Sequence, residues 1–118
     1  MKTETLDYFD HETQLEAFLA WDDSKPGRKP AVLVAHDWTG RREFAENKAK
    51  EMAKLGYVGF ALDMYGKGVF GADGDVEANS ALMNPLAGDR AALRKRVLSA
   101  LDVLKKHEQV DSSRVGAM

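Results

Sequence analysis

Cysteine is absent from this sequence of 118 residues, and so is any long apolar run. Without cysteine, these residues can form no disulfide and can offer no thiolate to a metal ion. No apolar run approaches the roughly 20 residues that a transmembrane helix needs. The first five residues (MKTET) also lack the apolar core of a secretory signal peptide. We therefore expect a soluble, cytoplasmic protein that has no membrane partner.

An excess of basic residues is missing as well. The 17 Lys and Arg residues are matched by 19 Asp and Glu residues, which gives a net charge of -2. Domains that bind nucleic acid usually carry a basic face, so we expect no nucleic-acid partner. The hydrophobic fraction of 44% and the charged fraction of 31% are typical of a soluble globular protein, and 118 residues make up one domain at most.

The first part of the chain has the alternation of a β-hairpin. Residues 3–8 and 13–21 alternate between two faces, and Leu15, Ala17, Leu19 and Trp21 share one of them. The segment between these runs, Asp-His-Glu at 10–12, has residues that favour a turn. The pattern predicts two antiparallel strands.

The rest of the chain alternates between apolar runs and helical segments. The expected strands are three apolar runs at residues 31–36, 57–62 and 115–118. The expected helices are residues 41–55, closed by Gly56, and residues 85–107, whereas the Gly- and Asp-rich residues 63–84 have no clear period and are expected to form a loop. Because strands and helices alternate, the three runs should lie side by side and parallel. We therefore predict an α/β protein with a mixed, mostly parallel sheet and flanking helices.

A polar loop follows the first buried run at His36, Asp37, Trp38, Thr39 and Gly40. Open α/β sheets bind ligands at the carboxyl ends of their strands. In α/β hydrolases, the loop after the equivalent strand gives one backbone N–H to the oxyanion hole. The alternative is that His36 and Asp37 cap the next helix while Trp38 fills a gap. Residue types alone favour that alternative.

Residues 66–71 match the G-x-G-x-x-G pattern of dinucleotide-binding loops. That mechanism needs the glycines to open directly into a helix whose N-terminus faces the pyrophosphate. Here Asp63, Met64 and Tyr65 separate the strand from the glycines, and the acidic Asp73 and Asp75 follow them. We therefore expect a flexible loop, and keep a nucleotide-binding half-domain only as a distant alternative.

Metal-binding spacings are not found either. Asp73, Asp75 and Glu77 alternate as calcium ligands do, but the sixth and twelfth positions counted from Asp73 hold Ala78 and Asn84 rather than Gly and Glu. The remaining candidates are the histidines, which show no metal-ligand spacing: His11, His36 and His107. We therefore expect no metal and no other cofactor.

Three segments together resemble the N-terminal half of the dienelactone hydrolase family. They are AVLVAHDWTG at 31–40, LGYVGFALDMYG at 55–66 and SRVGAM at 113–118. The resemblance covers nearly the whole chain and implies an α/β-hydrolase fold, of which residues 1–118 would be the N-terminal half of a single domain. The family's nucleophile elbow, G-x-C-x-G-G, would begin immediately after Met118, so the chain would be truncated before it.

The resemblance also implies roles for individual residues. Asp37 matches an acidic residue, usually Glu, whose carboxylate approaches the nucleophile, and Trp38 matches the residue that gives an oxyanion N–H. His36, Tyr65 and Lys67 are expected to bind the substrate. Lys67 would do so as the basic group, usually Arg, that holds a substrate carboxylate.

The resemblance implies the N-terminal portion of a carboxylic ester or lactone hydrolase, which supplies the oxyanion loop and part of the substrate cleft. Its partners would be a small-molecule ester or lactone, anionic ones included, and the missing C-terminal half of the same protein. Without a nucleophile on an elbow, residues 1–118 alone are expected to be inactive and marginally stable. The alternative from another class is a non-catalytic scaffold or interaction protein with the same fold.

Overall fold

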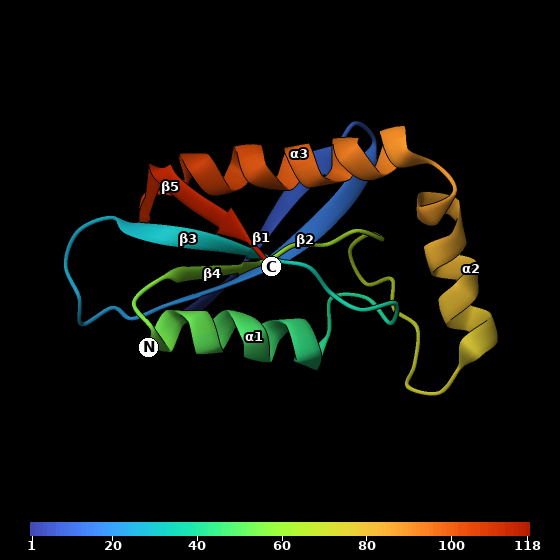
Figure 1. The fold of residues 1–118 in the computed structure, drawn as a ribbon, viewed down its shortest axis with the longest axis horizontal. Coiled ribbons are helices and arrows are strands. Elements are labelled where there is room, and N and C mark those ends of the chain that lie inside the picture. Colours follow the sequence, from blue (N-terminus) through green and yellow to red (C-terminus); the bar gives the residue numbers. More distant parts are fainter.

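A five-stranded sheet forms the middle layer of the computed structural model, which describes residues 1–118, and helices cover both faces of the sheet (Figure 1). The strand order is β1-β2-β4-β3-β5. Helices α1 and α3 lie on opposite faces, and α2 stands at one end of the sheet (Figure 1). The elements are β1 (Lys2–Asp10), β2 (Thr13–Trp21), β3 (Lys29–Val34), α1 (Glu43–Lys54), β4 (Val58–Ala61), α2 (Val76–Ala87), α3 (Arg90–Lys106) and β5 (Val110–Ala117).

The predicted hairpin and the predicted parallel strands are confirmed. β1 pairs with β2 in an antiparallel register from Lys2 opposite Trp21 to Asp10 opposite Thr13. β3 lies between β4 and β5 and is parallel to both. The sheet is therefore mixed and mostly parallel in its buried part, as the sequence predicts.

Two strand boundaries differ from the prediction. β3 begins and ends two residues earlier than the expected run 31–36, so His36 belongs to the loop that follows it. β5 begins at Val110, earlier than the expected run 115–118, and includes the polar residues 111–114. Residues 112–114 of β5 are exposed, and its pairing with β3 shifts register between the Lys29 and Ala31 positions.

Helix α1 buries a stripe of alanines rather than the larger residues of its sequence. Ala45, Ala49 and Ala53 are fully buried, whereas Phe44 is 54% exposed. Small side chains let the helix backbone approach β4 at Gly59, where a Cβ atom would lie 2.6 Å from the Cα of Ala49. The lack of a side chain on Gly59 therefore sets the distance between α1 and the sheet.

The predicted end of α1 at Gly56 is confirmed. Gly56 has a φ of 97° and its N–H donates to the carbonyl of Ala53, while the N–H of Tyr57 donates to the carbonyl of Met52. This pair of hydrogen bonds is the Schellman arrangement, in which the residue after the helix takes the left-handed conformation that glycine adopts readily.

The prediction was wrong in part for residues 63–107, because α2 occupies the second half of the expected loop and the expected second helix begins only at Arg90. Asp75 and Asp89 are the N-caps, and each side chain accepts a hydrogen bond from the backbone three residues later. Helix α2 lacked a recognisable period because its only buried residue is Asn79. Pro85, taken as the start of the second helix, lies instead near the end of α2.

Two apolar cores follow from the alternation of the strands. The face toward α3 buries side chains such as Leu19 and Phe60, with Ala100 and Leu104 from the helix. The face toward α1 buries Phe18 and the alanine stripe of the helix. No helix is both long enough and apolar enough to cross a bilayer.

Replacing Gly59 with alanine should destabilise the fold, because the added methyl group would collide with the backbone of Ala49 in helix α1. We expect the free energy of unfolding of the complete protein to fall by about 1–3 kcal/mol, as measured by chemical denaturation. Gly88→Ala is the control, since Gly88 is exposed and has an ordinary φ of -86°. Its effect should stay within about 0.5 kcal/mol. Equal midpoints for wild type and Gly59→Ala would contradict the close packing.

Candidate functional site

Two loops meet where β3 and β4 end, and a cavity of about 340 Å³ opens between them and the α2–α3 pair. The first loop follows Val34 and the second follows Ala61. This is the edge of the sheet where parallel α/β proteins bind their ligands. The cavity is lined by His36, Asp37, Trp38, Met64, Tyr65, Met83, Leu86, Ala87 and Leu93.

His36 ties the two loops together through both nitrogens of its ring. Its Nε2 accepts a hydrogen bond from the N–H of Met64 at 3.0 Å, and its Nδ1 lies 2.7 Å from the carbonyl oxygen of Asp37. Because a carbonyl only accepts, the proton must sit on Nδ1 and the ring is neutral. Burial lowers the pKa of His36 below its usual value, which agrees with a neutral ring. His36 therefore lines the cavity without a free ring nitrogen for a ligand.

Asp37 and Thr39 fold the first loop into a tight turn. The Oδ1 of Asp37 accepts hydrogen bonds from both the N–H and the hydroxyl of Thr39, and the N–H of Gly40 donates to the Asp37 carbonyl at 3.2 Å. Trp38 thus occupies the second position of a β-turn. The other carboxylate oxygen of Asp37 has no partner in the chain, and Asp37 lines the cavity.

Of the two backbone groups of Trp38, only the carbonyl is hydrogen-bonded within the chain. Its carbonyl accepts a hydrogen bond from the hydroxyl of Tyr65 at 3.0 Å, and the ring of Tyr65 lies 4.9 Å from the ring of His36. The N–H of Trp38 makes no hydrogen bond within the chain. An unpaired backbone donor is unusual unless water or a ligand meets it. This donor lies on a residue that lines the cavity.

Asp63 organises the second loop, and the sequence did not single it out by itself. Its side chain is buried and accepts hydrogen bonds from the backbone N–H groups of Glu16, Tyr65 and Gly66, each at 3.0 Å. The N–H of Asp63 donates to the hydroxyl of Tyr8, whose pKa is raised to about 12, chiefly by burial. Asp63 therefore sets the position from which Tyr65 reaches Trp38.

The glycine-rich segment 66–71 packs against the first loop, and most of its backbone N–H groups are already hydrogen-bonded within the chain. The N–H of Gly71 donates to the carbonyl of Thr39 at 2.8 Å, and the N–H of Lys67 donates to the carbonyl of Gln14 at 2.9 Å. Helix α2 begins only at Val76. A phosphate cradle needs free amides at the start of a helix, so the geometry argues against a dinucleotide loop here.

The side of the cavity opposite the two loops is lined by residues that were not predicted as site residues from the sequence. Met83, Leu86 and Ala87 come from α2, and Leu93 comes from α3. Asn79 anchors α2, because its buried side-chain amide exchanges hydrogen bonds with both the N–H and the carbonyl of Ala72. These residues were missed because residues 63–84 were predicted to be a loop.

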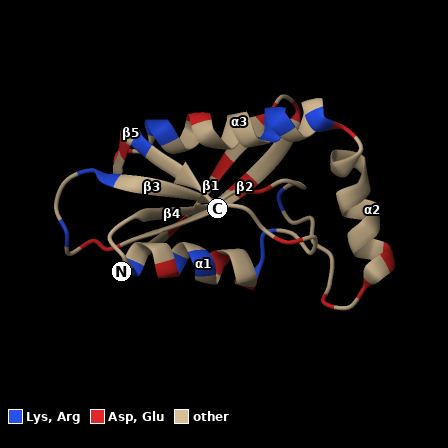
Figure 2. Ribbon diagram, in the orientation of Figure 1, with Lys and Arg blue, Asp and Glu red and all other residues tan.

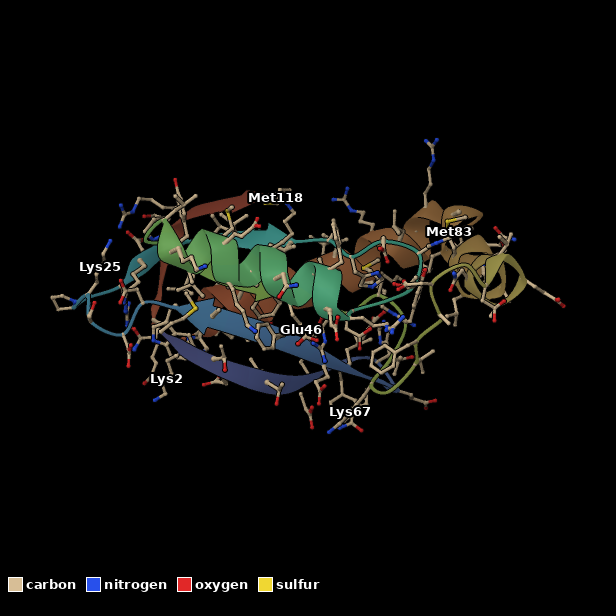
Figure 3. The ribbon with its side chains drawn as sticks, turned by 90° about the horizontal axis from the view of Figure 1, so that it is seen from below. Lys2, Lys25, Glu46, Lys67, Met83 and Met118 are labelled. Atoms are coloured by element: carbon tan, nitrogen blue, oxygen red, sulfur yellow. The ribbon has the colours of Figure 1, made fainter.

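Lys67 is not among the residues that line the cavity, and its role in binding a substrate carboxylate stays a prediction. Its ammonium lies 2.8 Å from a carboxylate oxygen of Asp7 and 3.7 Å from one of Glu16. The hydrogen bond to Asp7 raises the pKa of Lys67 above its usual value. Figure 3 shows Lys67 beside the β1–β2 hairpin, well apart from Met83 on α2. The carboxylates of Asp7 and Glu16 therefore hold the Lys67 ammonium at the hairpin rather than at the cavity.

Solved structures with the same architecture cover the chain almost completely. A dienelactone hydrolase-like promiscuous phosphotriesterase from metagenomic libraries is 33% identical over 98% of this chain and 47% of its own, with a TM-score of 0.92. The protein m3DLH is 35% identical over 98% of this chain and 48% of its own, with a TM-score of 0.91. An acetyl xylan esterase from Paenibacillus sp. R4, 20% identical with a TM-score of 0.57 over all of this chain and 45% of its own, shares the fold.

The chain spans about half the length of these structures. No curated protein matches it in a sequence comparison. The sequence profile described as the dienelactone hydrolase family matches residues 15–118, which include both loops of the site. By this match and by its α/β-hydrolase fold, the chain belongs to the dienelactone hydrolase family.

Proposed function

We propose that this chain forms the N-terminal half of the single catalytic domain of a carboxylic ester or lactone hydrolase, and that Trp38 supplies an oxyanion N–H. The observation that carries the proposal is the N–H of Trp38, which has no partner in the chain and belongs to a residue of the cavity wall. Family membership supports the same reaction class.

Attack on an ester carbonyl turns its oxygen into an oxyanion, which is stabilised by donors that are already in place. The turn from Asp37 to Gly40 and the hydroxyl of Tyr65 hold the peptide of Trp38 before any substrate arrives. One such donor typically contributes ~10²–10³ in rate. Because the loop is already fixed, its free N–H does not have to reorient during the reaction. Reorientation of the N–H would cost part of that gain.

The nucleophile, a Cys or Ser, would come from the length of the relatives that this chain does not span, together with a His base and an Asp that orients it. The nucleophile would attack the acyl carbon while its proton passes to the His. Asp37 would face that nucleophile through the carboxylate oxygen that Thr39 leaves free. The segment bearing these groups would be the covalent partner of residues 1–118.

Hydrolysis of para-nitrophenyl esters by the complete protein is the first test of this proposal. Release of nitrophenol above the buffer rate supports an esterase. No release from esters of several chain lengths would favour the alternative, a non-catalytic scaffold. A phosphotriester should be included, because one of the similar structures is named a promiscuous phosphotriesterase.

Trp38→Pro should lower kcat by ~10²–10³ relative to Trp38→Ala, because only proline removes the backbone N–H. Proline fits the second position of a β-turn, so the turn should survive the change. Both variants lose the indole, and Trp38→Ala is therefore the matched control. Unfolding midpoints check that both variants fold. Equal kcat values in two folded variants would rule out the oxyanion role.

Tyr65→Phe should reduce kcat about 3- to 10-fold with little change in KM, because the lost hydroxyl no longer holds the Trp38 carbonyl. Tyr57→Phe is the control, since the hydroxyl of Tyr57 makes no hydrogen bond in the chain and Tyr57 lies outside the cavity wall. If both variants lose activity equally, the Tyr65 hydroxyl has no special part in holding the loop.

His36 should remain neutral in the folded protein to below pH 6.5, its usual pKa, because burial disfavours the charged ring. The unfolded chain binds a proton there more readily, so the stability that His36 contributes is present above that pH and is lost as the pH falls toward the lowered pKa. Nitrogen-15 NMR of the imidazole should show the proton on Nδ1. A ring that becomes charged above pH 6.5 would contradict this assignment.

A further inference from the structure

We propose that the cavity selects an uncharged, apolar acyl group and discriminates against substrates that carry a carboxylate. This inference rests on the proposed ester hydrolysis and concerns the substrate class of the same site. It differs from the expectation for Lys67, which had pointed to anionic substrates. Three observations carry it: the apolar wall, the sign of the only lining charge, and the pairing of Lys67 and Arg96.

The apolar wall comes mainly from α2 and α3. Met83 and Leu86 on α2 and Leu93 on α3 face the cavity opposite the two loops. Figure 2 shows no basic residue along α2, whose one charged residue is Glu77 near its start. A carboxylate placed against this wall would lose its water without gaining a donor, which is costly.

The only charged side chain that lines the cavity is Asp37. Its carboxylate accepts hydrogen bonds from Thr39 but forms no ion pair with a basic residue. A second negative charge beside Asp37 would be repelled, and because Asp37 is exposed, water weakens this repulsion without changing its sign. A neutral acyl group meets no such penalty.

Two of the basic residues near the site, Lys67 and Arg96, are already paired. Lys67 is held by Asp7 and Glu16 on the hairpin. Arg96 of α3 donates to Asp10 at 2.7 Å and to the carbonyl of Met64 at 2.7 Å. Neither residue lines the cavity. Recruiting either one to a substrate carboxylate would require breaking these contacts first.

The test compares para-nitrophenyl hydrogen adipate with its methyl ester, in which a neutral ester group replaces the carboxylate, and uses the complete protein as the enzyme. We expect kcat/KM to be at least about 10-fold higher for the methyl ester. Hydrolysis of the acid at an equal or greater rate would overturn the inference while leaving the esterase proposal intact. Hydrolysis of neither substrate would instead refute the proposed function, and the inference with it.

A pair of leucines on α3 provides matched variants. Leu93 lines the cavity and is 40% exposed, whereas Leu98 lies outside the cavity wall and is 46% exposed. Leu93→Lys should raise the preference for the acid over the methyl ester about 3- to 10-fold by placing a cation in the wall. Leu98→Lys adds the same charge and should leave the ratio unchanged. Equal shifts in both variants would show that the wall does not set the selectivity.

Discussion

The buried carboxylate of Asp63 is the interaction on which the rest of the site depends. It accepts hydrogen bonds from three backbone N–H groups, one on β2 and two in the loop after β4. Those bonds fix Tyr65, whose hydroxyl fixes the carbonyl of Trp38. A buried carboxylate that lost these donors would be left uncompensated, so the loop has little freedom to rearrange. The position of the Trp38 loop therefore depends on a residue outside the cavity wall.

The parallel arrangement of the three apolar runs could be predicted from the sequence, because these runs are short, rich in β-branched or small residues, and separated by helical segments. The hairpin was equally plain from its alternation. Helix α2 could not be predicted in this way, since it buries only Asn79 and so has no apolar stripe. Its start is marked by the N-cap Asp75, a signal that was outweighed by the surrounding glycines and acidic residues.

In the site, as in the fold, some features could be predicted from local sequence and others could not. The loop carrying Asp37 and Trp38 follows a buried strand, and its position at the cavity could be predicted from that fact. The location of Lys67 could not, because it is decided by Asp7 and Glu16, which are distant in sequence. The apolar wall on α2 could not be predicted either, because α2 itself had been predicted to be a loop. As a result, the resemblance included anionic substrates through Lys67, whereas the lining of the cavity is mostly apolar with one negative charge.

The central claim is that the N–H of Trp38 is oriented, before substrate binds, to donate a hydrogen bond to an oxyanion. The most direct measurement is the NMR signal of this amide in the complete protein before and after addition of an alkyl trifluoromethyl ketone, which adds to a Cys or Ser nucleophile and forms a tetrahedral oxyanion. The account predicts that the Trp38 amide proton moves downfield as a new hydrogen bond forms, while the amides of Tyr65 and Gly66 change little. A Trp38 signal that stays in place while other amides shift would contradict the account.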